Sequence, residues 1–229
     1  LVAEEGKYIP EIKRYDISTV KGSVIVKDFS AEKFKMHLKS NKVNVIKILP
    51  GGVVTAKDTA EIQLDEKGEF VRNPEEDIVK VAVVERHQGT GNVACGFLKG
   101  YGIKAGAVAL SIAHDSHNII VVGVSDEEME FAVNSLIAQE GGMVLVKEGK
   151  VIESMPMPIA GLMSDQSGEW VDEKLTAIHA KAYEELGIAG DVEPVMTLCF
   201  MSLAVIPEVK LTDMGLFDVT TFSFIPVEA

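Results

Sequence analysis

Two short polar segments hold most of the side chains that could do chemistry. "ERHQGTGN" spans residues 85–92, and "HDSHN" spans residues 114–118. Each follows a run of apolar residues and supplies the acids, amides and imidazoles that acid–base chemistry or ligand binding requires. We expect the two segments to be adjacent in space. The candidate side chains are Glu85, Arg86, His87, Thr90, Asn92, His114, Asp115, Ser116, His117 and Asn118.

A metal site is one interpretation of these residues. His87, His114, Asp115 and His117 offer imidazole and carboxylate donors, which bind zinc, iron or manganese. The His-x-x-His spacing is a weak signal, and neither His-x-His nor His-Glu-x-x-His occurs in the chain. The other interpretation is a tight connection between strands, in which His114 and Asn118 hydrogen-bond the backbone.

A nucleotide site is a third interpretation, based on the glycines of "GTGNVA", residues 89–94. Gly-x-Gly-x-x-Ala between a strand and a helix can cradle a pyrophosphate, and Asp115 would be the ribose-binding acid. This interpretation requires a helix after the glycines. We expect a short one at residues 93–98, although Gly96 weakens it.

Composition and charge narrow the class of protein. The 229 residues carry 35 acidic and 22 basic side chains, a net charge of -13, which argues against nucleic acid and anionic membranes as partners. The longest apolar stretch, residues 195–206, is shorter than the roughly 20 residues that a membrane-spanning helix needs. Cys95 and Cys199 lie among apolar residues without paired spacing, which favours inert thiols in a reducing compartment.

The elements that position these segments follow from hydrophobic periodicity. Ser125 and Glu128 form a capping box that predicts a helix ending at Gly141, and a second apolar stripe predicts a helix over 171–186. Strands are predicted at 43–49, 78–84, 107–113, 118–124 and 220–225, and hairpins at 63–71 and 143–154. The stretch 78–84 is nearly continuously apolar, so we expect a strand that is buried on both faces. The order of elements favours an α+β fold with largely antiparallel sheets and a few packed helices.

A family resemblance covers most of the chain. "VAVVERHQGTGNVACGFLKGYGIKAGAVALSIAHDSHNIIVVG" is followed by "MPMPIAGLMSD", "PVMTLCFMSLAVIPEVKLTDMGL" and "VEA". These stretches resemble the C-terminal domain of bacterial and archaeal adenine deaminases, which belong to the amidohydrolase superfamily. The resemblance implies that residues 42–229 form this domain. Residues 1–41 would be the end of an accessory sandwich domain and a linker.

The resemblance also implies a function. Adenine deaminases convert adenine to hypoxanthine and ammonia in purine salvage, with a divalent metal pair, manganese or iron, held in a TIM-type barrel. That barrel is not present in this chain, so it would be the partner of the chain, which itself needs no cofactor. We expect a cytoplasmic homo-oligomer, a homodimer, in which the ten candidate side chains line the active site. The alternative is a self-sufficient metal-binding hydrolase that uses His87, His114, Asp115 and His117.

Overall fold

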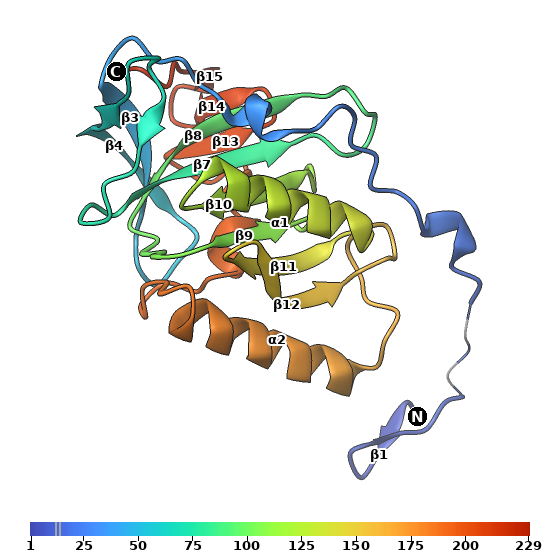
Figure 1. The fold of residues 1–229 in the computed structure, drawn as a ribbon. Helices are drawn as coiled ribbons and strands as arrows, with labels where there is room; N and C mark the ends of the chain where they lie inside the picture. The colour runs from blue at the N-terminus through green and yellow to red at the C-terminus, as the bar shows by residue number, and fades with distance from the viewer. Residues whose placement is uncertain (12, 14) are drawn as a thin grey trace.

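A central eight-stranded sheet organises the computed structural model, which describes residues 1–11, 13 and 15–229 (Figure 1). The strand order is β12-β11-β9-β10-β7-β8-β3-β4, and neighbours are antiparallel except for the parallel pair β3 and β8. The strands are β3 (Lys42–Ile48), β4 (Thr55–Glu61), β7 (Ile78–Val84), β8 (Val93–Lys99), β9 (Ala107–Leu110), β10 (Ile119–Gly123), β11 (Gly142–Lys147) and β12 (Lys150–Pro156). The described residues form a mixed α+β fold and no closed barrel, as the sequence predicted.

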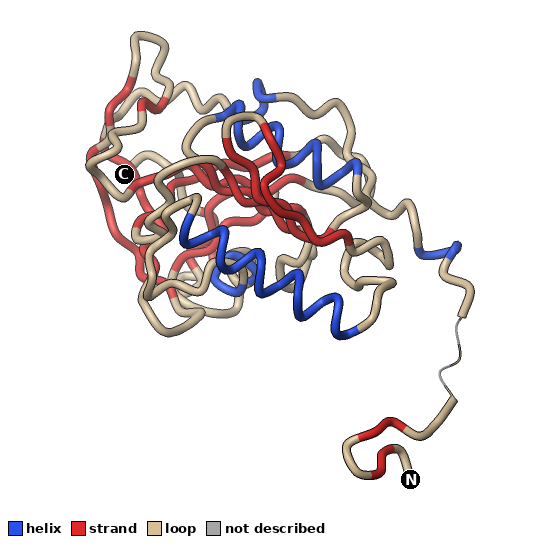
Figure 2. Tube along the Cα trace, turned by 60° about the horizontal axis from the view of Figure 1, so that its bottom comes forward, coloured by secondary structure: helices blue, strands red, loops and turns tan. Residues whose placement is uncertain are grey.

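Helices cover both faces of this sheet. The helix α1 (Asp126–Ala138) packs on β9, β10 and β11, and α2 (Gly168–Glu184) packs on β11 and β12. Val81 and Val83 of β7 belong to the same core cluster as α2, whereas Ala82 and Val84 belong to the cluster of α1. Figure 2 shows the sheet between these two helices. The prediction that β7 is buried on both faces is therefore confirmed.

Local capping explains where the two long helices begin. The Ser125 hydroxyl accepts a hydrogen bond from the Glu128 backbone N–H at 3.2 Å, which satisfies one free donor of the first turn of α1. The Ser167 hydroxyl accepts from the Trp170 N–H at 3.3 Å in the same way. The second helix thus begins at Gly168, slightly before the predicted position.

The C-terminal region forms a second, smaller sheet of β13 (Val209–Thr212), β14 (Gly215–Asp218) and β15 (Ser223–Phe224). It packs against β4, β7 and β8. The strand predicted at 220–225 is shorter than expected, because residues 219–222 form the turn before β15. The remaining elements are β1 (Ala3–Glu4), β2 (Lys7–Tyr8), β5 (Gln63–Leu64), β6 (Phe70–Val71), α3 (Met196–Cys199) and two 3₁₀ turns, η1 (Ser18–Val20) and η2 (Ala31–Phe34).

The helix predicted at residues 93–98 is wrong. This segment is strand β8, which pairs with β7 from Val93, opposite Val84, to Lys99, opposite Ile78. Its other edge pairs with β3. Backbone partners on both sides therefore decide the conformation, and one of them, β3, lies too far away in the sequence for local periodicity to detect.

One end of the central sheet gathers the loops of interest, and we call it the site end. Antiparallel pairing places Ile119 opposite Val84, and Leu110 opposite both Ile120 and Met143. The loops 85–92, 111–118 and 157–167 therefore leave the sheet at this end. No helix in the described part of the chain is long and apolar enough to cross a membrane.

Candidate functional site

Glu85 builds the first polar turn at the site end. Its carboxylate is buried and accepts hydrogen bonds from the backbone N–H groups of His87, Gln88 and Thr90 at 2.5, 2.8 and 2.9 Å. The Thr90 hydroxyl adds a fourth donor at 3.0 Å. Burial alone would raise the pKa of Glu85, but these hydrogen bonds outweigh it and lower the pKa to about 2. Glu85 is therefore a permanently charged structural anchor and not a proton donor at neutral pH.

The second polar turn is held from both sides. The His114 N–H donates to the Cys199 carbonyl at 2.8 Å, and the His114 ring packs on the Phe200 ring with centroids 4.9 Å apart. His117 adopts a left-handed backbone with φ of 53°, and its N–H donates to the Ala113 carbonyl at 2.6 Å. These contacts agree with the interpretation of this segment as a tight connection between strands, stabilised by its own polar groups.

The two turns lie side by side, as the sequence predicted, and we call them the twin turns (residues 85–92 and 114–118). The Arg86 N–H donates to the Asn118 side-chain oxygen at 3.3 Å. The Arg86 Nε–H donates to the His117 carbonyl at 2.5 Å, and His87 Nε2 donates to the Ser116 carbonyl at 2.7 Å. Three hydrogen bonds thus fix one turn against the other.

Arg86 extends this connection to a third loop. Its guanidinium is fully buried, and Nη2 donates to the Ala160 carbonyl at 3.2 Å. No described carboxylate pairs with it, and Nη1 has no hydrogen-bond partner among the described residues. Burial lowers the pKa of Arg86, although a guanidinium remains charged at neutral pH. The structure therefore places a buried, unpaired positive charge behind the twin turns.

His117 lies next to this charge. Burial is the main cause that lowers the pKa of the His117 imidazole. The neighbouring charges of His114 and Arg86 lower this pKa further. Its Nδ1 atom is buried and has no partner among the described residues. A lowered pKa favours the neutral imidazole at neutral pH.

The exposed members of the twin turns are the side chains that a ligand or another protein surface could reach. Asp115 is 83% exposed along its side chain and lies 4.0 Å from His114 Nδ1. His87, Thr90, Asn92 and Ser116 are also exposed. The Thr90 hydroxyl accepts from the Asn92 N–H at 3.2 Å, which keeps the first turn compact. Carboxylate, imidazole, amide and hydroxyl groups are therefore presented together at one surface.

The metal and nucleotide interpretations do not fit this geometry. Among residues 1–11, 13 and 15–229, no group of three or more His, Cys, Asp or Glu side chains is arranged to hold a metal ion. His87, His114, Asp115 and His117 are thus not gathered into such a group. The nucleotide interpretation fails because the glycines of residues 89–94 precede strand β8 and not a helix. A helix N-terminus that could receive a pyrophosphate is missing there.

The cysteines behave as the sequence predicted. Both thiols are unpaired, and burial raises the pKa of Cys95 and of Cys199 to about 12. Such thiols remain protonated at neutral pH and are poor nucleophiles.

The chain enters the domain across the site end. The Ala160 N–H donates to the Val20 carbonyl at 2.8 Å, and the Ile25 N–H donates to the Arg86 carbonyl at 2.8 Å. Residues 1–8 form a hairpin of β1 and β2 that stands away from the rest of the molecule (Figure 1). The segment 17–25 thus hydrogen-bonds to two of the loops at the site end.

Sequence reasoning missed two hollows, and the first of them lies beside the second polar turn. The first, of about 400 Å³, has Asp115 and Ser116 of the second turn in its wall, together with Ser202, Leu203, Ala204, Val205, Thr212, Asp213, Met214, Phe217 and Phe224. Most of these residues lie almost a hundred positions beyond the twin turns in the sequence. The strands in this region are short and Pro207 precedes them, so the sequence shows no hydrophobic periodicity there. Nothing in the pattern could therefore have placed these residues beside residues 114–118.

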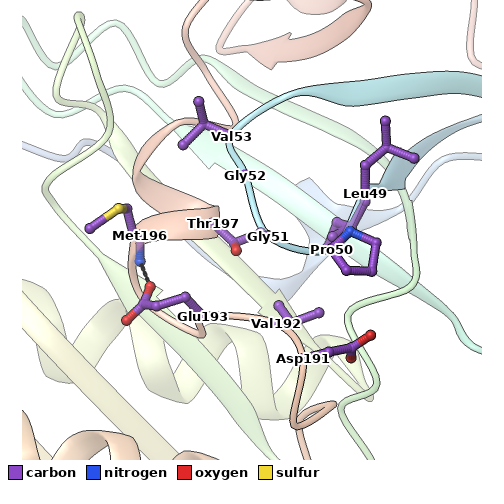
Figure 3. A pocket seen from close by; sticks show the side chains of 11 residues that line it. Leu49, Pro50, Gly51, Gly52, Val53, Asp191, Val192, Glu193, Met196 and Thr197 are labelled. Carbon is purple, nitrogen blue, oxygen red and sulfur yellow. Dashed lines mark hydrogen bonds between the residues drawn. The ribbon is translucent and has the colours of Figure 1, made fainter.

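The second hollow, of about 280 Å³, lies between the loop 48–53 and residues 191–197 (Figure 3). The Glu193 carboxylate accepts a hydrogen bond from the Met196 N–H and pairs with His179 Nε2. Glu193 is thus occupied by partners of its own. His179 lies on α2 and is half-buried.

Comparison with known proteins gives consistent matches. The family model described as "Adenine deaminase C-terminal domain" matches residues 52–223. "Adenine deaminase 2" of Desulfotalea psychrophila is 66% identical over 229 residues, which are all of this chain and 40% of that protein. "Adenine deaminase" of Ligilactobacillus salivarius is 48% identical over 227 residues, which are 99% of this chain and 39% of that protein. The chain therefore spans about 40% of the length of these curated relatives.

Proposed function

Because the chain belongs to the family of adenine deaminase C-terminal domains, we propose that it is the C-terminal part of an adenine deaminase. The reaction is the hydrolysis of adenine to hypoxanthine: water adds at C6, the exocyclic C–N bond breaks, and ammonia leaves. The observation that carries this proposal is the 66% identity to a relative named for this activity, over every residue of the chain.

In this proposal the residues here do not hold the metal of the reaction. The donors in the described part of the chain do not fit a metal centre, since no suitable group of three exists. The manganese or iron pair would belong to the N-terminal part, which we call the catalytic part. Residues 42–229 would be the C-terminal domain, and residues 1–41 the end of an accessory domain and the linker to it.

In this proposal the twin turns line the active site and contact the purine or a loop that covers it. Adenine carries ring nitrogens and an amine, so its recognition needs paired donors and acceptors of the kind that Asn, Asp and His provide. Two features support this placement. The entering segment 17–25 crosses the site end, and exposed polar groups gather there on turns that are themselves held rigidly.

We further propose a cytoplasmic homo-oligomer, a homodimer, that acts in purine salvage. The two cysteines, which are both free, support a reducing compartment.

The test is release of ammonia from adenine by two proteins. One is this 229-residue chain, and the other is the longer polypeptide that carries it behind the catalytic part. We expect turnover only from the longer polypeptide. Turnover by the 229-residue chain alone would contradict the proposed division of labour, and no turnover by either would contradict the proposed reaction.

One variant tests the role of the twin turns. Asp115→Asn changes an exposed carboxylate that receives no described hydrogen bond, so folding should be unaffected. In the longer polypeptide we expect kcat/KM for adenine to fall about tenfold, the effect of losing one hydrogen bond of roughly 1.4 kcal/mol. Asp172→Asn, on the exposed face of α2, is the matched control and should leave kcat/KM unchanged. If Asp115→Asn and Asp172→Asn have the same kcat/KM, Asp115 does not contribute to the active site.

A further inference from the structure

Apolar side chains are exposed around the 400 Å³ hollow beside the second polar turn. We call Val205, Met214, Phe222 and Phe224 the aromatic rim. All four are at least half exposed, and Phe222 reaches 75%. Three of them line the hollow, and Phe222 packs edge-to-face on Phe217, which also lines it, with ring centroids 5.2 Å apart. A contiguous exposed apolar surface of this kind marks a place where another surface binds.

The rim is held rigidly before anything binds to it. The buried Asp218 carboxylate accepts from the Thr220 N–H at 2.9 Å, from the Thr220 hydroxyl at 2.6 Å and from the Thr221 N–H at 3.2 Å. Lys57 Nζ completes the set at 2.9 Å. The Thr220 hydroxyl and Lys57 hold the pKa of Asp218 well below its usual range. This carboxylate therefore stays charged and fixes the turn that carries Phe222.

Phe222 itself has an unusual backbone. Its φ of 51° lies in the left-handed region, which bulky side chains rarely adopt. The strain accompanies an exposed position, so no burial within this chain compensates for it. A rigid, exposed aromatic side chain loses little entropy on binding and is typical of the residues that dominate interface energies.

Ser202 supplies an independent sign that the hollow lacks an occupant. Its side chain is more than nine-tenths buried in the wall of the hollow, and its hydroxyl has no hydrogen-bond partner among the described residues. A buried hydroxyl without a partner is destabilising, so an incoming polar group would be favoured there. The wall also contains the carboxylates Asp115 and Asp213, which favour a basic or hydrogen-bond-donating group.

We propose that the aromatic rim and its hollow form the docking surface for the catalytic part of the same polypeptide. The inference rests on the proposed function. The larger share of the relatives' length lies outside the match to this chain, and the segment 17–25 brings the incoming chain to the site end. Asp115 and Ser116 belong to both the hollow and the second polar turn. A catalytic part that covers the rim therefore also faces the twin turns. This placement would bring the twin turns into contact with the active site.

Thiol labelling of the longer polypeptide tests this surface with a matched pair of variants. Val205→Cys places a thiol on the rim, at a position that is 68% exposed here. Val151→Cys is the control, since Val151 is 44% exposed and lies near the start of β12, at the opposite end of the sheet. The natural Cys95 and Cys199 give a low background because their pKa values are about 12.

In the 229-residue chain, Val205→Cys should react with a maleimide at least as fast as Val151→Cys. In the longer polypeptide we expect Val205→Cys to react at least about tenfold more slowly, at every protein concentration, because access limits thiol chemistry. Val151→Cys should not change. Equal rates in the longer polypeptide would overturn the proposal. Protection of Val205→Cys that disappears on dilution would also overturn it, because a second copy would then cover the rim.

The ammonia assay separates this inference from the proposed function. Release of ammonia by a longer polypeptide whose rim reacts freely would refute the docking surface alone. A protected rim without deamination of adenine would refute the proposed reaction and leave the docking surface supported.

Discussion

The twin turns and the aromatic rim are neighbours with opposite surface chemistry. The twin turns are polar, and most of their hydrogen-bonding groups are satisfied within the chain, by Glu85 in one turn and by Arg86 between the two. The rim is apolar and leaves large side chains in solvent, with the unpartnered Ser202 beside them. Most polar groups of the first region have partners within the chain, whereas the second region leaves large apolar side chains exposed to solvent.

This difference separates two effects that a mutation can have. Changes of the buried Glu85 and Arg86 in the twin turns should lower the stability of the 229-residue chain itself, because they remove contacts already present in it. Changes in the rim should leave the stability of the 229-residue chain nearly unchanged and should lower only the stability of the longer polypeptide. Comparing the free energy of unfolding in the two proteins therefore distinguishes a structural residue from a docking residue.

The largest effect is expected at Glu85. Glu85→Gln keeps the shape but loses the charge that four donors share. The wild-type pKa is lowered to about 2 from an ordinary value of 4.5, which corresponds to about 3 kcal/mol of stability at neutral pH. Because the folded-state pKa is the lower one, this contribution is present above about pH 4.5 and is lost as the pH falls toward 2.

Urea unfolding of both proteins at several pH values measures this contribution. The difference in unfolding free energy between wild type and Glu85→Gln should be about 3 kcal/mol at pH 7 and should shrink below pH 4.5. Glu66→Gln, at an exposed position of the hairpin turn 65–68, is the control. A difference that does not depend on pH would show that the carboxylate charge is unimportant to the turn.

Arg86→Met should have the next largest effect. It leaves the carbonyls of His117 and Ala160 without their donor, and each unsatisfied buried group costs roughly 1–3 kcal/mol. Removal of a buried charge that has no carboxylate partner offsets part of this loss. We expect the 229-residue chain to lose about 2 kcal/mol in urea unfolding, the balance of these effects. A more stable variant would mean that the buried charge outweighs the contacts between the loops.

Sequence patterns predicted the elements whose signal is local. The helix α1 was predictable because Ser125 caps it and apolar residues recur on one face. Strand β7 was predictable because all of its residues except Lys80 are apolar. Strand β8 was misassigned because its conformation depends on pairing with β3, roughly fifty residues earlier in the chain.

The candidate site was predictable only in part, for the same reason. Polar residues that follow buried strands mark the loops at a sheet end, so the adjacency of the twin turns could be expected. The acceptor of the Arg86 guanidinium, Ala160, lies 74 residues away in a loop without any polar signal. The rim combines four-residue or shorter strands and a turn, and nothing in their sequence shows that they surround Asp115.

Phe222→Asn tests the rim with an effect that should depend on the protein used. Asn tolerates a positive φ better than Phe, so the 229-residue chain should keep or slightly increase its stability. The longer polypeptide should lose about 2 kcal/mol, because an aromatic contact at the docking surface disappears. Phe131→Asn, on the exposed side of α1, is the control, and it should change both proteins equally. An equal change at Phe222 in both proteins would indicate that nothing covers it.

The smallest expected effect is the most specific, because its sign should reverse between the two proteins. Ser202→Ala removes a buried hydroxyl that has no described partner, so the 229-residue chain should gain up to about 1 kcal/mol. If the catalytic part supplies a hydrogen bond to this hydroxyl, the same substitution leaves the partner atom unsatisfied and destabilises the longer polypeptide by about 1 kcal/mol. Thermal unfolding of wild type and Ser202→Ala, in the 229-residue chain and in the longer polypeptide, measures the sign of the stability change in each protein. Stabilisation in both proteins would show that the hollow stays unfilled, and the docking surface would then have to rest on Phe222 and its neighbours without Ser202.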